Sequence, residues 1–210
     1  SGDVSGLATL GYRDSETTLT TLRGEAYNIY SVPSESTTTM GAMSVGDLVI
    51  ESGGSFNISG GHLVLDSIDA QAGSSVTWNS GALDFRVGQT LDSNFILGES
   101  VVVGLNQILS TGLTADDTTD SVEVDGGHLH LRGASGFAEG KLILTSGTLE
   151  YYGSALYVGA GEMLGQDLTL GNNQRLLTDS VGEFQVKNGG SLTLDGGELQ
   201  TFTTDLVEAG

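Results

Sequence analysis

The segment HLHLR, residues 128–132, has the residue types best suited to chemistry. A strand directs alternate side chains to the same side, so His128, His130 and Arg132 are expected on one face. Two imidazoles at this spacing can bind Zn²⁺ or Cu²⁺. A related segment elsewhere in the chain does not repeat the pair of histidines, since its three positions hold His62, Val64 and Asp66. The sequence by itself therefore favours a solvated strand face over a metal or catalytic site.

A second candidate is the densest acidic stretch, ADDTTDSVEVD, at residues 115–125. Carboxylates on a loop suit Ca²⁺, so one hypothesis is a weak calcium site formed by Asp116, Asp117 and Asp120. The stretch is not an EF-hand loop, because the glycine and the bidentate glutamate are misplaced. It also lacks the glycine–aspartate nonapeptide of calcium-loaded β-rolls. A solvated insertion between structural repeats is the favoured interpretation, with calcium as the alternative.

Motifs of the common enzyme classes are missing: the chain has no G-x-S-x-G, no P-loop and no H-E-x-x-H. We therefore expect no catalytic residues, no obligatory cofactor and no enzymatic activity. Asn106–Gln107 and Asn173–Gln174 recur in the same register. They could form a buried amide ladder at a corner or contact sugar hydroxyls, and the ladder is the favoured interpretation.

Charge and composition narrow the range of partners. The net charge is −20, from 27 acidic and 7 basic residues. Nucleic acid is not an expected partner, because a phosphate backbone requires a basic surface. No apolar run of about 20 residues occurs, so we expect no membrane span. The chain has 33 glycines, one proline and no cysteine, which favours many tight corners between short strands and excludes disulfides.

A repeat supplies the elements that must position these residues. Five segments share the pattern apolar-x-apolar, two small or polar residues, glycine, any residue and leucine. The pattern indicates a strand, a glycine corner and a second strand. In two pairs of copies the second copy follows the first by 20 residues, and a larger unit of roughly 66 to 70 residues contains about three coils of that length. The copies are FNISGGHLVL (56–65), VTWNSGALDF (76–85), VEVDGGHLHL (122–131), LILTSGTLEY (142–151) and LTLDGGELQT (192–201).

This spacing predicts an all-β fold, a parallel β-solenoid with coils of about 20 residues. An antiparallel β-sandwich is the rival, but the equal spacing of the copies favours the solenoid. The recurring leucines are expected to point inward: Leu63, Leu83, Leu129, Leu149 and Leu199. The recurring glycines are expected at tight corners: Gly61, Gly81, Gly127, Gly147 and Gly197. The position between them varies and is expected to point outward, as His62, Ala82, His128, Thr148 and Glu198.

The repeat predicts two parts of the chain. Residues 46–210 are the β-solenoid repeats, and residues 1–45 form either an N-terminal cap or an exchanged β segment that pairs with a neighbouring subunit. The final stretch, TFTTDLVEAG, contains half a repeat and no basic residue. We therefore expect an open edge that favours a homo-oligomer or head-to-tail filament.

The phrases SGGSFNISGGHLVL and KNGGSLTLDGGELQ resemble the glycine-rich β-solenoid repeats of secreted bacterial proteins. Similar repeats occur in autotransporter-type passenger domains and in surface proteins that carry a PEP-CTERM sorting signal. The resemblance covers about residues 46–201 and implies an extracellular, cell-surface location with a structural, adhesive or matrix role. We expect a structural filament. The alternative is a carbohydrate-binding adhesin module for cell-surface glycans, with an aromatic platform drawn from Trp78, Tyr151, Tyr152 and Tyr157.

Overall fold

The computed structural model describes residues 17–18, 26–32, 37–39, 42–179, 183–187 and 189–201. Within these residues every helix or strand assigned is a β-strand, and the strands pair in parallel from one coil to the next. The predicted all-β parallel β-solenoid is therefore confirmed, with coils of about 21 residues. The described residues contain no helix that is long and apolar enough to cross a membrane.

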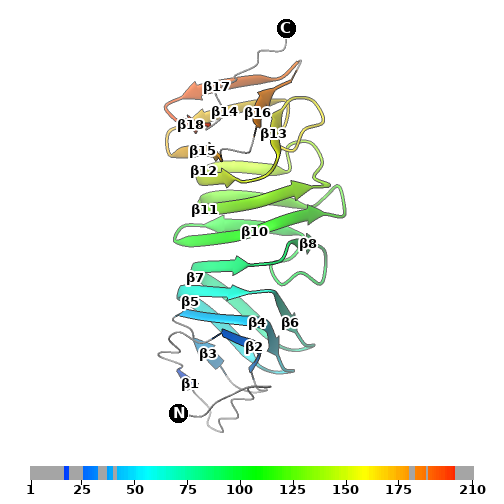
Figure 1. Ribbon diagram of the computed structural model, residues 1–210, viewed down its shortest axis with the longest axis vertical. Helices are drawn as coiled ribbons and strands as arrows, with labels where there is room; N and C mark the ends of the chain where they lie inside the picture. Colours follow the sequence, from blue (N-terminus) through cyan, green and yellow to red (C-terminus); the bar gives the residue numbers. More distant parts are fainter. Residues whose placement is uncertain are drawn as a thin grey trace. The chain divides into compact units, whose positions relative to one another are not determined.

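The chain divides into two compact units, and the first is Ser1–Val87. Its two longest strands pair in register, with Ser55 opposite Ser75, 20 residues further along the chain. Figure 1 shows the strands of this unit stacked from blue to cyan. The strands are β1 (Thr17–Thr18), β2 (Ala26–Val32), β3 (Thr37–Thr39), β4 (Ala42–Ile50), β5 (Ser55–Leu65), β6 (Ser67–Ala70) and β7 (Ser75–Phe85).

Strands β2 and β3 belong to the segment predicted as a cap or an exchanged element. They pair in parallel with β4 and β5, with Ala26 opposite Ser44 and Thr37 opposite Ser55. Part of this segment therefore has the same coil-on-coil pairing as the repeat. Most of the other residues before position 42 lie outside the described residues, so the cap, the exchanged segment and the boundary at residue 45 stay predictions.

The second unit is Gly88–Gly210. In one series each strand pairs with the next, in the order β8, β10, β11, β12, β15 and β18. In addition, β9 pairs with β11, β13 with β16, and β14 with β17. Their bounds are β8 (Gln89–Leu91), β9 (Ser100–Gly104), β10 (Gln107–Ala115), β11 (Ser121–Ser135), β12 (Leu142–Tyr151), β13 (Ala155–Val158), β14 (Asp167–Gly171), β15 (Gln174–Thr178), β16 (Glu183–Val186), β17 (Ser191–Asp195) and β18 (Glu198–Gln200).

The core consists of apolar columns that run from coil to coil. In β11 buried and partly exposed residues alternate, as the period of two requires of a strand with one face inward. Leu63, Leu83, Leu129 and Leu149 are fully buried, which confirms their predicted inward direction. Leu199 is half-buried, although it lies opposite the fully buried Leu176. Burial of one such leucine contributes about 2 kcal/mol.

The glycine corners exist because the backbones of successive coils approach closely there. Gly147 has a φ of 93°, and a Cβ added to it would lie 2.3 Å from the carbonyl oxygen of Gly127. Both conditions exclude a larger residue. In the preceding coil, Gly126 has the positive φ, and a Cβ on Gly127 would lie 2.5 Å from the oxygen of Gly104. The predicted requirement for glycine at these corners is confirmed.

The recurring Asn–Gln pairs form a second kind of corner. Asn106 and Asn173 are the non-glycine residues with positive φ in the described residues, at 64° and 68°. The side-chain oxygen of Gln107 accepts a hydrogen bond from the backbone N–H of Gly104 at 2.6 Å, and Gln174 accepts one from Gly171. The predicted buried amide ladder is wrong, because both asparagines are exposed. The glutamines instead stabilise the turn.

Leu129→Ala tests the inward column. We expect the free energy of unfolding to fall by about 2 to 5 kcal/mol, since the substitution leaves a cavity between two coils. The measurement is urea denaturation followed by circular dichroism. The matched control is Ile143→Ala, because Ile143 lies on the outward face of the next coil and is exposed. Equal losses in the two variants would contradict the assignment of inward and outward faces.

Candidate functional site

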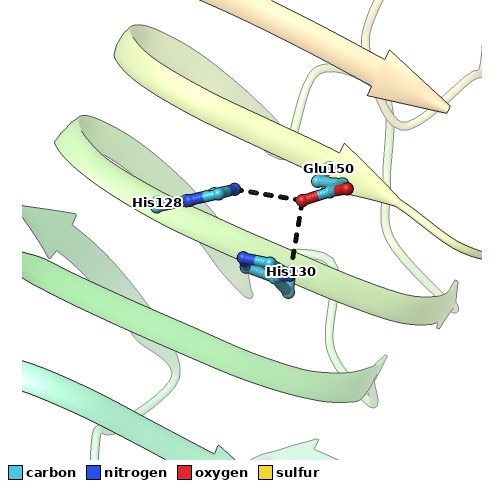
Figure 2. Close-up of side chains that lie close together, drawn as sticks. All are labelled: His128, His130 and Glu150. Atoms are coloured by element: carbon cyan, nitrogen blue, oxygen red, sulfur yellow. Dashed lines mark ion pairs between the residues drawn. The ribbon is translucent and has the colours of Figure 1, made fainter.

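The candidate site lies on the outward face of β11 and β12. His128 and His130 come from β11, two residues apart, and both are partly exposed while Leu129 between them is buried. The parallel register places Glu150 of β12 directly opposite His130. Figure 2 shows the carboxylate of Glu150 directed towards both imidazoles from the neighbouring coil. The sequence identified the two histidines as possible ligands, and the stacking of coils adds a carboxylate to them.

One carboxylate oxygen serves both histidines. Oε2 of Glu150 lies 3.3 Å from Nε2 of His128 and 3.4 Å from Nδ1 of His130. The two imidazole centroids are 4.0 Å apart, with the ring planes inclined by 35°. Histidine, cysteine, aspartate and glutamate are the side chains that commonly bind metals. In the part of the chain that the structure describes, this is the one group of three of them whose ligand atoms all lie within 4.8 Å of one another. We call His128, His130 and Glu150 the His–His–Glu cluster.

Tyr152 orients the carboxylate of the cluster. Its hydroxyl donates a hydrogen bond to Oε1 of Glu150 at 2.5 Å, and its ring stacks on His130 with a centroid distance of 6.2 Å. The hydrogen bond to Glu150 is the main reason that the pKa of Tyr152 rises to about 12. The phenol therefore stays protonated and occupies one carboxylate oxygen, which leaves the other oxygen directed at the histidines.

Nε2 of His128 is buried and makes no hydrogen bond. Nε2 lies 3.3 Å from Oε2 of Glu150, which is close enough for an ion pair. The angle between the two groups does not meet the requirement for a hydrogen bond. Burial is the main cause that lowers the pKa of His128, followed by the proximity of His130, and Glu150 opposes both effects. The neutral imidazole is therefore favoured, with a buried nitrogen that lacks a hydrogen-bond partner.

A hollow of about 440 Å³ adjoins the cluster and is lined by Ser110, His130, Arg132 and Tyr152. A guanidinium nitrogen of Arg132 donates to the carbonyl oxygen of Ser110 at 3.3 Å. Arg132 is exposed, and with the partly exposed histidines it follows the alternation of β11. The prediction that His128, His130 and Arg132 share one face is confirmed.

The aspartates predicted to bind calcium build a turn. Asp120 is fully buried, and its Oδ2 accepts hydrogen bonds from the backbone N–H groups of Asp116 and Asp117, both at 2.9 Å. Oδ1 of Asp117 accepts from the backbone and the hydroxyl of Thr119, and the backbone hydrogen bond is the main cause that lowers the pKa of Asp117. The carboxylate oxygens of Asp116, Asp117 and Asp120 do not all lie within 4.8 Å of one another, unlike the ligand atoms of the His–His–Glu cluster. Calcium binding there stays a prediction.

The four aromatic candidates for a glycan platform lie in different environments. Tyr151 is buried, and Trp78 is half-buried opposite Ile58, with its indole N–H donating to the carbonyl oxygen of Gly81. Tyr157 is half-buried beneath Nζ of Lys187, which lies 3.9 Å from its ring centroid. Tyr152 is exposed and is the aromatic residue that borders the hollow.

Comparison with known proteins finds no match to any family model, curated protein or solved structure. The class that the fold and site define is a parallel β-solenoid with a two-histidine, one-carboxylate cluster on its outward face.

Asp120→Ala tests the structural role of the acidic turn. Removal of the carboxylate leaves two backbone N–H groups without their acceptor, so we expect the free energy of unfolding to fall by about 1 to 3 kcal/mol. Asp116→Ala is the control, because the exposed Asp116 side chain can be removed while its backbone N–H is kept. Thermal melts in chelator and in millimolar Ca²⁺ complete the experiment. A large increase in melting temperature with Ca²⁺, lost in both variants, would show a calcium site instead of a purely structural turn.

Proposed function

We propose that this protein is an extracellular structural β-solenoid at the cell surface, whose stacked coils assemble head-to-tail with further copies of the chain. The observation that carries the proposal is an exposed inward side chain in the last coil of the described residues. In the second unit, Leu194 of β17 lies opposite Leu170 of β14. Leu170 is fully buried, whereas Leu194 is 55% exposed. The inward column is thus covered in one coil and uncovered in the next.

The backbone of this coil supports the same interpretation. Among the described strands, β17 pairs with β14 alone and β18 with β15 alone, so each has one side without a strand partner. A strand edge beside an exposed apolar column is a template for another strand. A coil of similar cross-section would satisfy the backbone groups and cover Leu194 together.

The partner in this proposal is a second copy of this chain. Described strands near the other end of the sequence, β1 and β3, also pair in parallel with their neighbours. Head-to-tail stacking would therefore continue the same ladder. In such a contact the same two ends of the chain meet at every joint. Repetition of the contact gives a filament, unless the rotation between successive subunits closes the assembly into a ring. The net charge of −20 would oppose lateral association of filaments.

The extracellular location is part of the proposal and is supported by the resemblance of the glycine-rich repeats to those of secreted bacterial proteins. The outward positions of the repeat vary from coil to coil, as His62, Ala82, His128, Thr148 and Glu198 do. Such variation suits a scaffold better than a surface with one repeated binding motif. No catalytic step is included in the proposal.

Leu194→Lys tests the assembly. We expect oligomers to dissociate at concentrations at least about tenfold higher than for the unmodified protein, because a charge would be buried at the joint. Light scattering after size-exclusion chromatography and electron microscopy measure the assembly. Val102→Lys is the matched control, since Val102 is 54% exposed but lies on the outward face of β9. The proposal would be overturned if the unmodified protein were a monomer at every concentration. It would also be overturned if Leu194→Lys and Val102→Lys weakened the oligomers equally.

A glycan-binding adhesin module is the second candidate, supported by the exposed Tyr152 beside the hollow that Arg132 and Ser110 also line. Exposed aromatic rings and nearby hydrogen-bond donors suit sugar recognition. We expect binding on a glycan array to be lost in Tyr152→Ala and kept in Tyr157→Ala. An array without binding, or binding that both variants keep, would remove this candidate.

A further inference from the structure

We propose that the His–His–Glu cluster is a binding site for a divalent transition-metal ion of the Zn²⁺ class. The proposal goes beyond the structural function, because a filament scaffold does not require a metal. It assigns Nε2 of His128, Nδ1 of His130 and Oε2 of Glu150 as the three protein ligands.

The distances between the ligand atoms already approach those of a metal site. Tetrahedral Zn²⁺ with bonds of about 2.0 to 2.1 Å requires its ligand atoms to be about 3.3 to 3.4 Å apart. Oε2 of Glu150 is 3.3 Å from Nε2 of His128 and 3.4 Å from Nδ1 of His130. The two imidazole nitrogens lie within 4.8 Å of each other, so a modest rotation of the partly exposed rings completes the triangle.

The donor set selects the class of metal. Two imidazole nitrogens and one carboxylate oxygen suit Zn²⁺ and the neighbouring first-row ions. Ca²⁺ and Mg²⁺ prefer oxygen ligands and bind imidazole nitrogen weakly. Three protein ligands on an outward face leave a fourth position for water or another molecule, and one of the ligands, His130, also lines the hollow with Ser110, Arg132 and Tyr152.

Two features of the cluster fit a metal. Nε2 of His128 is buried without a hydrogen-bond partner, and a metal ion would accept the lone pair of this nitrogen. Tyr152 holds Oε1 of Glu150, which directs Oε2 towards the histidines, as groups around metal ligands commonly do. We regard Tyr152 as a positioning residue.

The nearby cations are compatible with the site. Arg175 lies opposite Thr148, which lies opposite His128, so Arg175 is two coils away from that histidine. It makes two hydrogen bonds to Glu198 at 2.8 and 3.3 Å. Its charge is therefore largely balanced by its own partner. Arg132 donates to the carbonyl oxygen of Ser110. The carboxylate of Glu150 and the strongly acidic chain favour the approach of a cation.

His62 provides an internal comparison, because it occupies the same repeat position as His128. It lies opposite Ala82, and Val64, two residues further on, lies opposite Asp84. At the described positions around His62, Val64 stands in the place of His130 and Asp84 in the place of Glu150, so the second imidazole is missing. We therefore expect His62 to make no contribution to metal binding, which makes it the matched control.

The experiment is a titration of the chelator-treated protein, residues 1–210, with ZnCl₂, measured by isothermal titration calorimetry. We expect one Zn²⁺ per chain, with affinity reduced at least about tenfold by His128→Ala, His130→Ala or Glu150→Gln, and unchanged by His62→Ala. Tyr152→Phe should weaken binding by about 10 to 100-fold without changing the stoichiometry. Co²⁺ in place of Zn²⁺ should give the strong visible absorption of a four-coordinate ion.

A second measurement requires no variant. In nuclear magnetic resonance spectra of the unmodified protein, Zn²⁺ should shift the imidazole signals of His128 and His130 and leave those of His62 in place. The proposal is overturned if these signals do not move, if all three histidines respond alike, or if Ca²⁺ displaces Zn²⁺ at equal concentration. The last two results would indicate diffuse binding to the acidic surface. Circular dichroism without metal establishes that each variant is folded.

Discussion

The parallel, in-register pairing of one coil with the next is the interaction on which the rest of the structure depends. Within the second unit it aligns like residues into continuous columns, and one column passes through β10, β11, β12, β15 and β18 as Leu109, Leu129, Leu149, Leu176 and Leu199. Each leucine packs on the one below, about 4.8 Å away. The backbone hydrogen bonds and the apolar core therefore extend along the same direction, and any residue that alters the register disturbs both.

The same pairing explains how the acidic chain tolerates its charge. Carboxylates directly opposite one another in a ladder would repel. In several places the residue opposite or near an acidic side chain in the neighbouring coil is a hydroxyl that donates to it. The pairs are Ser67–Asp47, Ser191–Asp167, Thr145–Glu123 and Ser146–Asp125. The outward faces thus combine high negative charge with polar contacts between coils.

Outward columns also determine where chemistry can occur. Ser110, His130 and Glu150 occupy one column, while Ile108, His128 and Thr148 occupy the next. A cluster forms where adjacent columns and adjacent coils hold suitable side chains, and the outward residues change with each coil. The His–His–Glu cluster is consequently a local feature of β11 and β12, on a scaffold whose inward columns are mostly apolar.

The sequence by itself determined the fold class, the inward leucines and the glycine corners, because the alternation within a strand and the spacing of about 20 residues are both local patterns. It also placed His128 and His130 on an outward face. Only the tertiary structure brought Glu150 and Tyr152 to them, showed that the Asn–Gln corners are exposed turns, and assigned Asp120 to a buried turn. The reason is register: contacts between coils depend on the number of residues in each intervening turn. The sequence separation of paired residues therefore changes along the chain, from 20 between Ser55 and Ser75 to 27 between Thr148 and Arg175 and 23 between Arg175 and Glu198. A repeat pattern predicts which face of the strand a side chain occupies. The register between neighbouring coils determines which side chain lies opposite it.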